Sequence, residues 1–335
     1  MFWVVFVFVA FVAVSAYFAY KTVFIPFKTN ETAYVYINGD KDFDNLVLQL
    51  RENAGLPSEA VFRLMAQRMK YPQNMKTGRY AVRKGDNMVG LIRRLRSGEQ
   101  AAVGLTFNNI RTKENLAGRL SQQLMLDSLT LLDALDNAEK AKSLGFDENT
   151  FVAMFIPNTY QIYWDTDEDK LLARMKKEYD AFWNAGRKAK AEKEGLTPVQ
   201  VSTLASIVEE EATFADEYPI VAGLYLNRLR RGMRLEADPT VKFAVGDFSL
   251  RRILYKHLEV ESPYNTYKNE GLPPGPIRVP SIKGIDAVLS PQENNYLFMC
   301  AKDDLSGRHN FATTHAEHVR NAAKYQKALN ERGIY

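Results

Sequence analysis

The hydrophobic pattern of the chain is most uniform at its N-terminus. From Met1 to Tyr20 no residue is charged, and Phe, Val and Ala predominate. A helix rises about 1.5 Å per residue, so a run of this length can span the roughly 30 Å hydrocarbon core of a bilayer. We therefore expect residues 1–22 to form a transmembrane anchor. The alternatives are a cleaved signal peptide, which would want a charged start, and a buried core helix.

Short strand patterns and helical patterns share residues 23–105. Ala33–Ile37 and Gly78–Val82 are rich in β-forming residues and adjoin turn residues. Apolar residues at helical spacing predict three helices, which begin near Asp42, near Ser58 and after Gly85-Asp86. The residues expected to face inward are Phe43, Leu46, Val47 and Leu50 in the first helix, Val61, Leu64 and Met65 in the second, and Met88, Leu91, Ile92 and Leu95 in the third.

Residues 106–335 contain both helical and strand patterns, and we expect them to form a second folded unit. We expect helices around Lys113–Leu126 and Asp127–Ala141, and a strand with a loop over Phe151–Trp164. A long charged helix is expected over Lys170–Glu194. Thr197, Ile220 and Asp238 then begin three more helices, with Thr197 and Asp238 as N-caps that precede proline. Strands and helices without regular βαβ alternation predict an α+β fold.

Composition and charge narrow the classes of protein that fit. The 335 residues are 46% hydrophobic and 25% charged, which is typical of a folded protein. A net charge of +4 is too small to indicate a nucleic-acid partner. The single cysteine, Cys300, excludes an intramolecular disulfide and a multi-cysteine metal site. His315 and His318 lack the pattern of a zinc-binding helix, so we expect neither metal nor cofactor.

One acidic residue occupies an apolar helix face. Leu204, Ile207, Val208 and Glu211 are spaced i, i+3, i+4 and i+7, whereas Glu209 lies about 200° from Glu211 around the helix. Burial of a carboxyl group raises its pKa, and a pKa near 7 lets the group both give and take a proton. Alternatively, Glu211 reaches solvent or forms a salt bridge with an arginine such as Arg228.

Polar and aromatic motifs downstream suit a sugar-binding cleft, because aromatic rings pack on pyranose faces and amides reach hydroxyl groups. These motifs also occur in plain connectors. They are Asn227-Arg228-Leu229, Met233-Arg234-Leu235, Asp238-Pro239-Thr240-Val241, Tyr264-Asn265-Thr266-Tyr267, Gly271-Leu272-Pro273-Pro274-Gly275-Pro276-Ile277 and His309-Asn310-Phe311.

Together with Leu204–Glu211, these blocks occur in the order seen in the YceG-like family, the endolytic murein transglycosylases, which the chain resembles over about residues 197–319. Tyr80–Asn87 resembles the start of a LysM module, a small glycan-binding fold, although any strand–turn–helix with a Gly-Asp turn has this pattern. The resemblance implies an anchor (1–22), a LysM-like subdomain with its linker (23–105) and a catalytic domain (106–335) on the extracytoplasmic side of the cytoplasmic membrane.

The resemblance also implies roles for single residues. The catalytic glutamate maps to Glu211, with Glu209 as the fallback. The implied substrate-binding residues are Asn227, Arg228, Asp238, Thr240, Tyr264, Asn265, Tyr267 and His309. Asn158 stands where the family usually has an acidic residue, so a catalytic contribution from that position is weakened or moved.

The implied reaction cuts glycan strands of peptidoglycan internally and leaves 1,6-anhydro-N-acetylmuramic ends. One carboxyl group suffices for it. A lysozyme-type hydrolase would need a second acid, for which Glu236 or Asp238 are candidates. A non-catalytic peptidoglycan-binding scaffold is the alternative from another class. The expected partners are glycan strands, the membrane and, by resemblance, cell-wall synthases.

Overall fold

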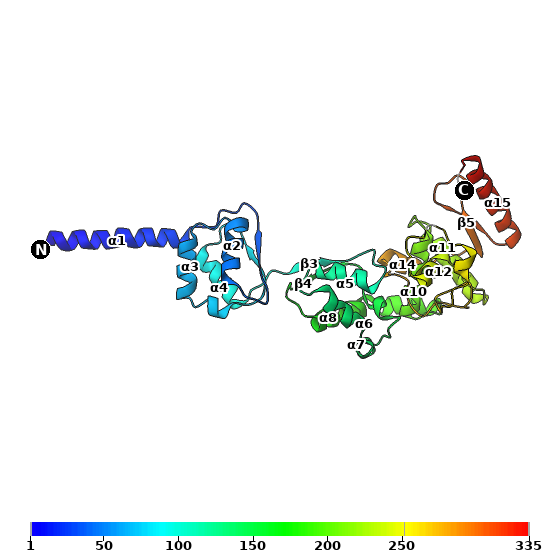
Figure 1. Cartoon of the computed structure of the whole chain (residues 1–335), viewed down its shortest axis with the longest axis horizontal. Helices are drawn as coiled ribbons and strands as arrows, with labels where there is room; N and C mark the ends of the chain where they lie inside the picture. The colour runs from blue at the N-terminus through cyan, green and yellow to red at the C-terminus, as the bar shows by residue number, and fades with distance from the viewer. Residues whose placement is uncertain (1, 251, 334–335) are drawn as a thin grey trace. The chain divides into compact units, whose positions relative to one another are not determined.

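The computed structural model describes residues 2–250 and 252–333, and its chain divides into two compact units (Figure 1). Unit 1 comprises Met1–Leu105 together with two later segments, Ser121–Leu126 and Tyr160–Asp167. Unit 2 comprises Thr106–Leu120, Asp127–Thr159 and Glu168–Tyr335. The chain therefore returns twice to unit 1 after it has entered unit 2.

The N-terminal helix α1 spans Phe2–Phe24. Many of the α1 side chains whose burial is described are exposed, among them Phe6, Phe8 and Phe11. Over residues 2–250 and 252–333, no helix is both long enough and apolar enough to span a membrane. Met1 lies outside the described residues. The anchor therefore stays a prediction.

Unit 1 is built on a two-stranded antiparallel sheet. Strand β1 (Ala33–Ile37) pairs with β2 (Gly78–Val82) in a register that places Ala33 opposite Val82 and Ile37 opposite Gly78. Helices α2 (Phe43–Ala54) and α3 (Glu59–Arg68) and a short 3-10 helix (Pro72–Asn74) lie between the strands in sequence, and α4 (Met88–Ser97) follows β2. Both predicted strands and all three predicted helices are confirmed.

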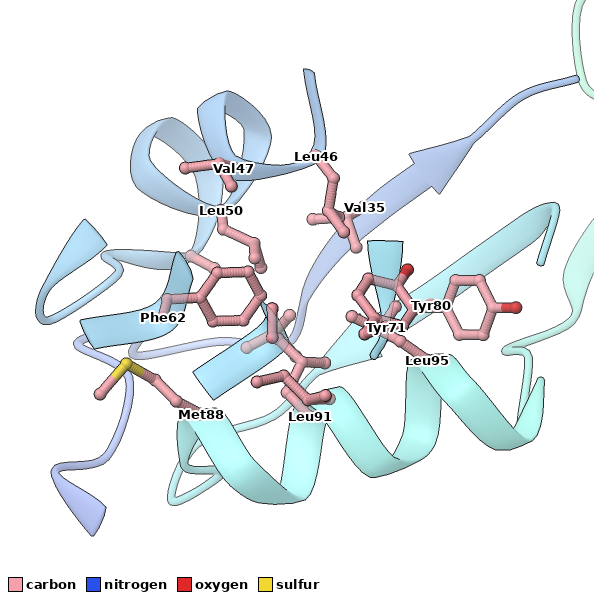
Figure 2. Packing of buried hydrophobic residues seen from close by; sticks show 14 of the residues in the cluster. Val35, Leu46, Val47, Leu50, Phe62, Tyr71, Tyr80, Met88, Leu91 and Leu95 are labelled. Carbon is pink, nitrogen blue, oxygen red and sulfur yellow. The ribbon is translucent and has the colours of Figure 1, made fainter. Parts of the chain in front are cut away.

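The core of unit 1 is assembled from the inner face of the sheet and the apolar faces of these helices (Figure 2). Side chains of α2 and α4 point toward Val35 and Tyr80 of the sheet. Most of the predicted inward residues are buried, but the prediction for α3 was wrong at Leu64, which is 52% exposed. Phe62 and Ala66, one turn apart, face the core instead, because the helix is rotated toward its larger aromatic residue.

Strands β3 (Val103–Thr106) and β4 (Thr159–Ile162) form a second two-stranded sheet. A 3-10 helix at Phe151–Met154 precedes β4, so Phe151–Trp164 contains the predicted strand and a short helix. The remaining helices before residue 194 are α5 (Lys113–Ser121), α6 (Ser128–Asp136), α7 (Ala138–Ser143), α8 (Glu168–Phe182) and α9 (Ala185–Lys193).

Three predicted helix lengths in this region were wrong. Lys113–Leu126 is helical only to Ser121, and Asp127–Ala141 contains two helices, α6 and α7, separated at Asn137. The expected helix over Lys170–Glu194 is also two helices, because Asn184 accepts a hydrogen bond from the backbone amide of Arg187 and starts α9. Asparagine caps compete with helix continuation, which hydrophobic spacing alone does not reveal.

The second half of unit 2 centres on α10 (Pro198–Glu211), which Thr197 caps as predicted. In return, the side-chain oxygen of Gln200 accepts a hydrogen bond from the backbone amide of Thr197. Helix α10 packs against α11 (Tyr218–Arg230), α12 (Asp238–Val245) and α14 (Ile282–Leu289). The short helix α13 (Tyr255–Leu258) adjoins α12. Strands β5 (Phe298–Ala301) and β6 (His309–Ala312) form an antiparallel hairpin that α15 (His315–Glu331) covers. The elements confirm the predicted α+β class.

Candidate active site

A pocket of about 370 Å³ opens in unit 2 beside the C-terminal end of α10. Glu211, the last residue of α10, lines it together with Tyr225 and Arg228 of α11. The turn before α12 and the β5–β6 hairpin complete the walls. The remaining lining residues are Leu224, Leu235, Glu236, Asp238, Tyr267, Leu297, Phe298, Met299, Cys300, Ala301, His309 and His318.

Glu211 is only partly exposed to solvent, and among the described residues no cation contributes to the shift of its pKa. Its Oε1 atom accepts a hydrogen bond of 2.9 Å from the hydroxyl group of Tyr225. Burial raises the pKa of Glu211 from 4.5 to about 7, the Tyr225 bond opposes this rise, and the charges of Asp238 and Glu210 add to it. Burial also raises the pKa of Tyr225 well above 10, so this phenol stays a donor. At neutral pH both forms of the Glu211 carboxyl group are therefore populated.

Glu209, the fallback candidate, faces another part of unit 2. Its side chain is 4% exposed, and its Oε1 accepts hydrogen bonds from the backbone amide (2.9 Å) and the hydroxyl group of Ser281. Ser281 is the N-cap of α14, and Arg278 lies 3.7 Å from the other carboxylate oxygen of Glu209. A Cβ at Gly284 would lie 2.4 Å from Glu209, so this glycine makes room for it. Glu209 therefore fixes the start of α14 against α10.

Glu210 is held by two arginines. Arg111 donates two hydrogen bonds to its carboxylate, at 3.2 and 3.0 Å, and Arg278 donates a third at 2.7 Å. We call Arg111, Arg278, Glu209 and Glu210 the arginine cluster. Of the three consecutive glutamates, Glu211 alone lines the pocket.

Arg228 lines the pocket, but its hydrogen bonds go to groups other than Glu211. The residue is 6% exposed, and its guanidinium group donates hydrogen bonds to the carbonyl oxygens of Arg234 (2.8 Å) and Leu297 (2.9 Å) and to the carboxylate of Glu236. Glu236 adopts a left-handed φ of 51°, an unfavourable conformation that the Arg228 contact helps to hold. The pairing of Glu211 with Arg228 that the sequence left open is therefore replaced by an Arg228–Glu236 pair.

Asp238 and Tyr267 form a second polar pair in the pocket. The Tyr267 hydroxyl group donates a 2.7 Å hydrogen bond to Asp238. The prediction that Asp238 caps α12 was wrong: Ala237 is the N-cap, and Asp238 is the first helical residue. The N-cap is the residue immediately before the first helical residue. Glu236 forms a left-handed turn and helical backbone begins at Asp238, so the N-cap is Ala237. The Asp238 carboxylate is thus available to the pocket.

His309 reaches the pocket from β6. Its backbone amide and its Nδ1 each lie 3.1 Å from the carboxylate of Glu217, which is 5% exposed at the start of α11. This contact ties the C-terminal hairpin to α11, which also carries Tyr225. Glu217 and the hairpin residues Phe298 and Cys300 were not among the predicted site residues, since no local pattern distinguishes them from ordinary helix-start and strand positions.

Four predicted substrate-binding residues lie outside this pocket. Asn227 donates hydrogen bonds to the carbonyl oxygens of Asn294 (2.9 Å) and Tyr296 (3.2 Å). Thr240 is buried and bonds Ala237 and Thr266. Tyr264 contacts Phe243 and Asn149, and Asn265 is buried with its amide on the carbonyl oxygens of Leu258 and Val260. Thr240 and Asn265 hold the segments that carry Asp238 and Tyr267, whereas Asn227 holds the segment that precedes β5.

Asn158 also lies away from the pocket lining. It is exposed, and its side chain accepts a 2.8 Å hydrogen bond from the backbone amide of Thr159. Over the described ranges, no group of three or more His, Cys, Asp or Glu residues is arranged to hold a metal ion. The rings of His315 and His318 instead adjoin Phe298.

Comparison with known proteins adds an independent line of evidence. The model of the YceG-like family matches residues 35–324. An endolytic murein transglycosylase of Bacillus subtilis is 29% identical over 302 residues, which cover 84% of this chain and 82% of that protein. An endolytic murein transglycosylase of Streptococcus pneumoniae is 26% identical, over 95% of this chain and 64% of the longer relative.

A solved structure is also similar. The crystal structure of a YceG-like protein from Listeria monocytogenes matches with a TM-score of 0.56 and 27% identity, over 87% of this chain and 99% of that one.

Proposed function

The chain belongs to the YceG-like family, and we propose that it cleaves glycan strands of peptidoglycan internally, with Glu211 as the single catalytic acid and base. The enzyme is a peptidoglycan lytic transglycosylase, as its relatives' names indicate. The observation that carries the role of Glu211 is its carboxyl group in the pocket, with a pKa of about 7 and a tyrosine as its hydrogen-bond partner.

The first step is protonation of the leaving group. Protonated Glu211 gives its proton to the glycosidic oxygen between N-acetylmuramic acid and N-acetylglucosamine, and the bond from the anomeric carbon to that oxygen breaks. Because Oε1 accepts the Tyr225 hydrogen bond, Oε2 is the oxygen that carries the proton. The positive charge that develops on the sugar ring is stabilised by the carboxylate of Asp238, which lines the same pocket.

The second step closes a ring within the cleaved sugar. Ionised Glu211 takes the proton from the C6 hydroxyl group of the muramic residue, and this oxygen bonds to the anomeric carbon. One carbon–oxygen bond breaks and one forms, the carboxyl group regains its proton, and no water is consumed. The products are a new glucosamine end and a 1,6-anhydro-muramic end. A carboxyl group with a pKa near the working pH suits both proton transfers.

Hydrolysis of the lysozyme type is the second candidate, and the presence of Asp238 in the pocket favours it. A hydrolase would use this second carboxylate to activate water or to attack the sugar. Mass spectrometry of digested glycan separates the two reactions, because an anhydro end weighs one water less than a reducing end. Products with reducing ends alone would contradict the transglycosylase mechanism.

The same measurement assigns the catalytic residue. Wild type, Glu211→Gln and Glu209→Gln are digested in parallel with purified glycan strands. We expect anhydro products from wild type and Glu209→Gln, and none from Glu211→Gln. A Glu211→Gln protein that still yields products would remove Glu211 from the mechanism. If the protein were a non-catalytic scaffold, none of the three would produce any.

The proposed location of the enzyme is supported by its substrate and by its N-terminal sequence. Peptidoglycan lies outside the cytoplasmic membrane, and the uncharged residues 1–20 suit a membrane anchor. We place the catalytic unit on the extracytoplasmic side. Protease added to intact spheroplasts tests this: a C-terminal tag should be lost while a cytoplasmic control protein persists.

We further propose that unit 1 contains a LysM-like module, that is, a small glycan-binding fold. Its order of strand, two helices and strand from β1 to β2, with an antiparallel pairing of the two strands, supports such a module.

A further inference from the structure

A pocket of about 410 Å³ lies in unit 1, on the opposite face of the β1–β2 sheet from the hydrophobic core. The register of the sheet explains its floor. Tyr36 and Arg79 are directly opposite each other, so their side chains share one face, while Val35, Ile37 and Tyr80 point into the core. Tyr36 and Arg79 both line this pocket. We call it the sheet pocket.

The walls of the sheet pocket come from the segments that return to unit 1. Gln122 and Gln123 belong to Ser121–Leu126, and Trp164 belongs to Tyr160–Asp167. The two segments are joined by a 2.8 Å hydrogen bond from the amide of Met125 to the carbonyl oxygen of Trp164. Both excursions of the chain therefore contribute side chains to one pocket, which the β1-to-β2 segment alone does not form.

Further hydrogen bonds fix the position of Trp164. The neighbouring Asp165 accepts hydrogen bonds from Thr77 (2.6 Å) and from the Gln100 amide (3.0 Å). The rings of Tyr36 and Trp164 meet edge to face, 5.0 Å apart at 70°. Such rigid aromatic surfaces suit ligand recognition, because little side-chain entropy is lost when a ligand binds.

The polar groups of the sheet pocket complement these rings. The Arg79 guanidinium group stacks 3.5 Å from the ring centre of Tyr34, and it also donates a hydrogen bond to the carbonyl oxygen of Ala102. Among the described residues that line the pocket, Arg79 alone carries a charge. Two glutamine amides provide donors and acceptors. Tyr36 is 39% exposed, which leaves apolar ring surface open to a ligand.

Aromatic rings, amides and one cation together match an acetylated amino sugar. The C–H face of a pyranose packs on an aromatic ring, while hydroxyl and acetamido groups bond amides. Arginine additionally donates hydrogen bonds to the carbonyl oxygens of acetamido and lactyl groups. A volume of about 410 Å³ lies within the ordinary range of ligand pockets.

We propose that the sheet pocket binds sugars of the glycan strand outside the segment that is cleaved. This inference rests on the proposed function, since it takes the substrate class from it. A strand held in unit 1 and cut in unit 2 is engaged at two places, and the second contact raises the effective concentration of a long strand at the active site. Binding and cleavage of long strands should therefore depend on the sheet pocket, whereas cleavage of short oligosaccharides should not.

The test measures binding of full-length protein to long glycan strands freed of stem peptides, in the non-cleaving Glu211→Gln background. Trp164→Ala and Tyr36→Ala should each weaken binding about tenfold, and Gln122→Ala about threefold. Tyr163→Ala is the matched control, because Tyr163 is adjacent, 56% exposed and absent from the pocket lining. Trp164→Phe should bind long strands more tightly than Trp164→Ala, because it keeps an aromatic ring. Such a partial recovery shows that the weaker binding of Trp164→Ala does not result from loss of folding.

The outcomes separate this inference from the proposed function. With Glu211 intact, Trp164→Ala should cleave short oligosaccharides at the wild-type rate and long strands more slowly. Unchanged long-strand affinity in both Trp164→Ala and Tyr36→Ala would overturn the sheet-pocket proposal and leave the cleavage mechanism standing. Binding that disappears when stem peptides are removed would show a peptide occupant and would also overturn it. Cleavage by Glu211→Gln would instead overturn the proposed function.

Discussion

Helix α10 ends in three glutamates that meet two different surroundings. On one side, the carboxylates of the arginine cluster contact the guanidinium groups of Arg111 and Arg278 and the N-terminus of α14. On the other side, Glu211 faces a pocket and is bonded to the uncharged Tyr225. Compensated carboxylates stabilise a fold, whereas an uncompensated one carries a raised pKa and can exchange protons. Neighbouring glutamates on one helix can therefore differ in pKa, because their surroundings differ.

The largest effect should come from removing the proton of the pocket-facing glutamate. Glu211→Gln keeps the shape of the side chain and an oxygen that can accept the Tyr225 bond, but it can neither give nor take a proton. We expect glycan cleavage to fall about 10³-fold or more. Product release measured by liquid chromatography checks this, with the exposed Glu192→Gln as the matched control. Residual activity within tenfold of wild type would end the distinction between the two sides of α10.

The arginine cluster should respond in stability rather than in chemistry. Glu209→Ala removes the partner of the Ser281 amide and leaves Arg278 less compensated. The free energy of unfolding should fall by about 3 kcal/mol, with a modest change in the rate of cleavage by the folded fraction. Urea denaturation of the full chain measures the first quantity. A variant as stable as wild type but inactive would transfer the catalytic role to Glu209.

The pH dependence of stability should distinguish the two sides as well. Because the pKa of Glu211 is raised from 4.5 to about 7, the unfolded chain loses this proton first as pH rises. Stability from this group is complete below about pH 4.5, declines as pH rises through 7, and then stays constant. Glu211→Gln should therefore match wild type at acidic pH and exceed it by on the order of 3 kcal/mol at pH 8. Denaturation at both pH values provides the measurement, and equal differences at both would contradict the raised pKa.

Tyr225 should adjust the pKa of Glu211 without being essential for cleavage. Its hydrogen bond lowers the pKa of Glu211, so Tyr225→Phe should raise that pKa further. The alkaline limb of the pH profile of kcat/KM should move up by about one pH unit, and kcat should fall about tenfold. Tyr264→Phe is the matched control, because its hydroxyl group bonds Asn149 outside the pocket. A merely structural role of Tyr225 would lower stability without moving the limb.

The smallest effect is expected at the edge of the arginine cluster. Arg111 is 37% exposed, and Glu210 keeps its hydrogen bond to Arg278 when Arg111 is lost. Arg111→Gln should therefore lower the free energy of unfolding by about 0.5–1 kcal/mol and leave cleavage unchanged. Urea denaturation and the cleavage assay together test it. A large loss of activity would show that the cluster contributes to catalysis.

Much of the fold was predictable because local patterns agreed with the tertiary structure. The strands at Ala33–Ile37 and Gly78–Val82 and the caps at Asp42, Ser58 and Thr197 all follow from local residue preferences. The predictions that were wrong depended on competition between elements. Asn184 interrupts an otherwise continuous helical pattern, and the turn at Glu236 displaces the N-cap from Asp238 to Ala237.

The sequence alone determined that Glu211 lies on the apolar face of α10 and that Glu209 does not, because helical geometry fixes the angle between side chains on one helix. It also placed Arg228, Asp238, Tyr267 and His309 among the candidates. Only the tertiary structure separated these pocket residues from Asn227, Thr240, Tyr264 and Asn265, which hold loops in place. It alone paired Tyr225 with Glu211 and the arginines with Glu209 and Glu210. The pKa of a carboxyl group depends on contacts between segments far apart in sequence, which a local pattern does not contain.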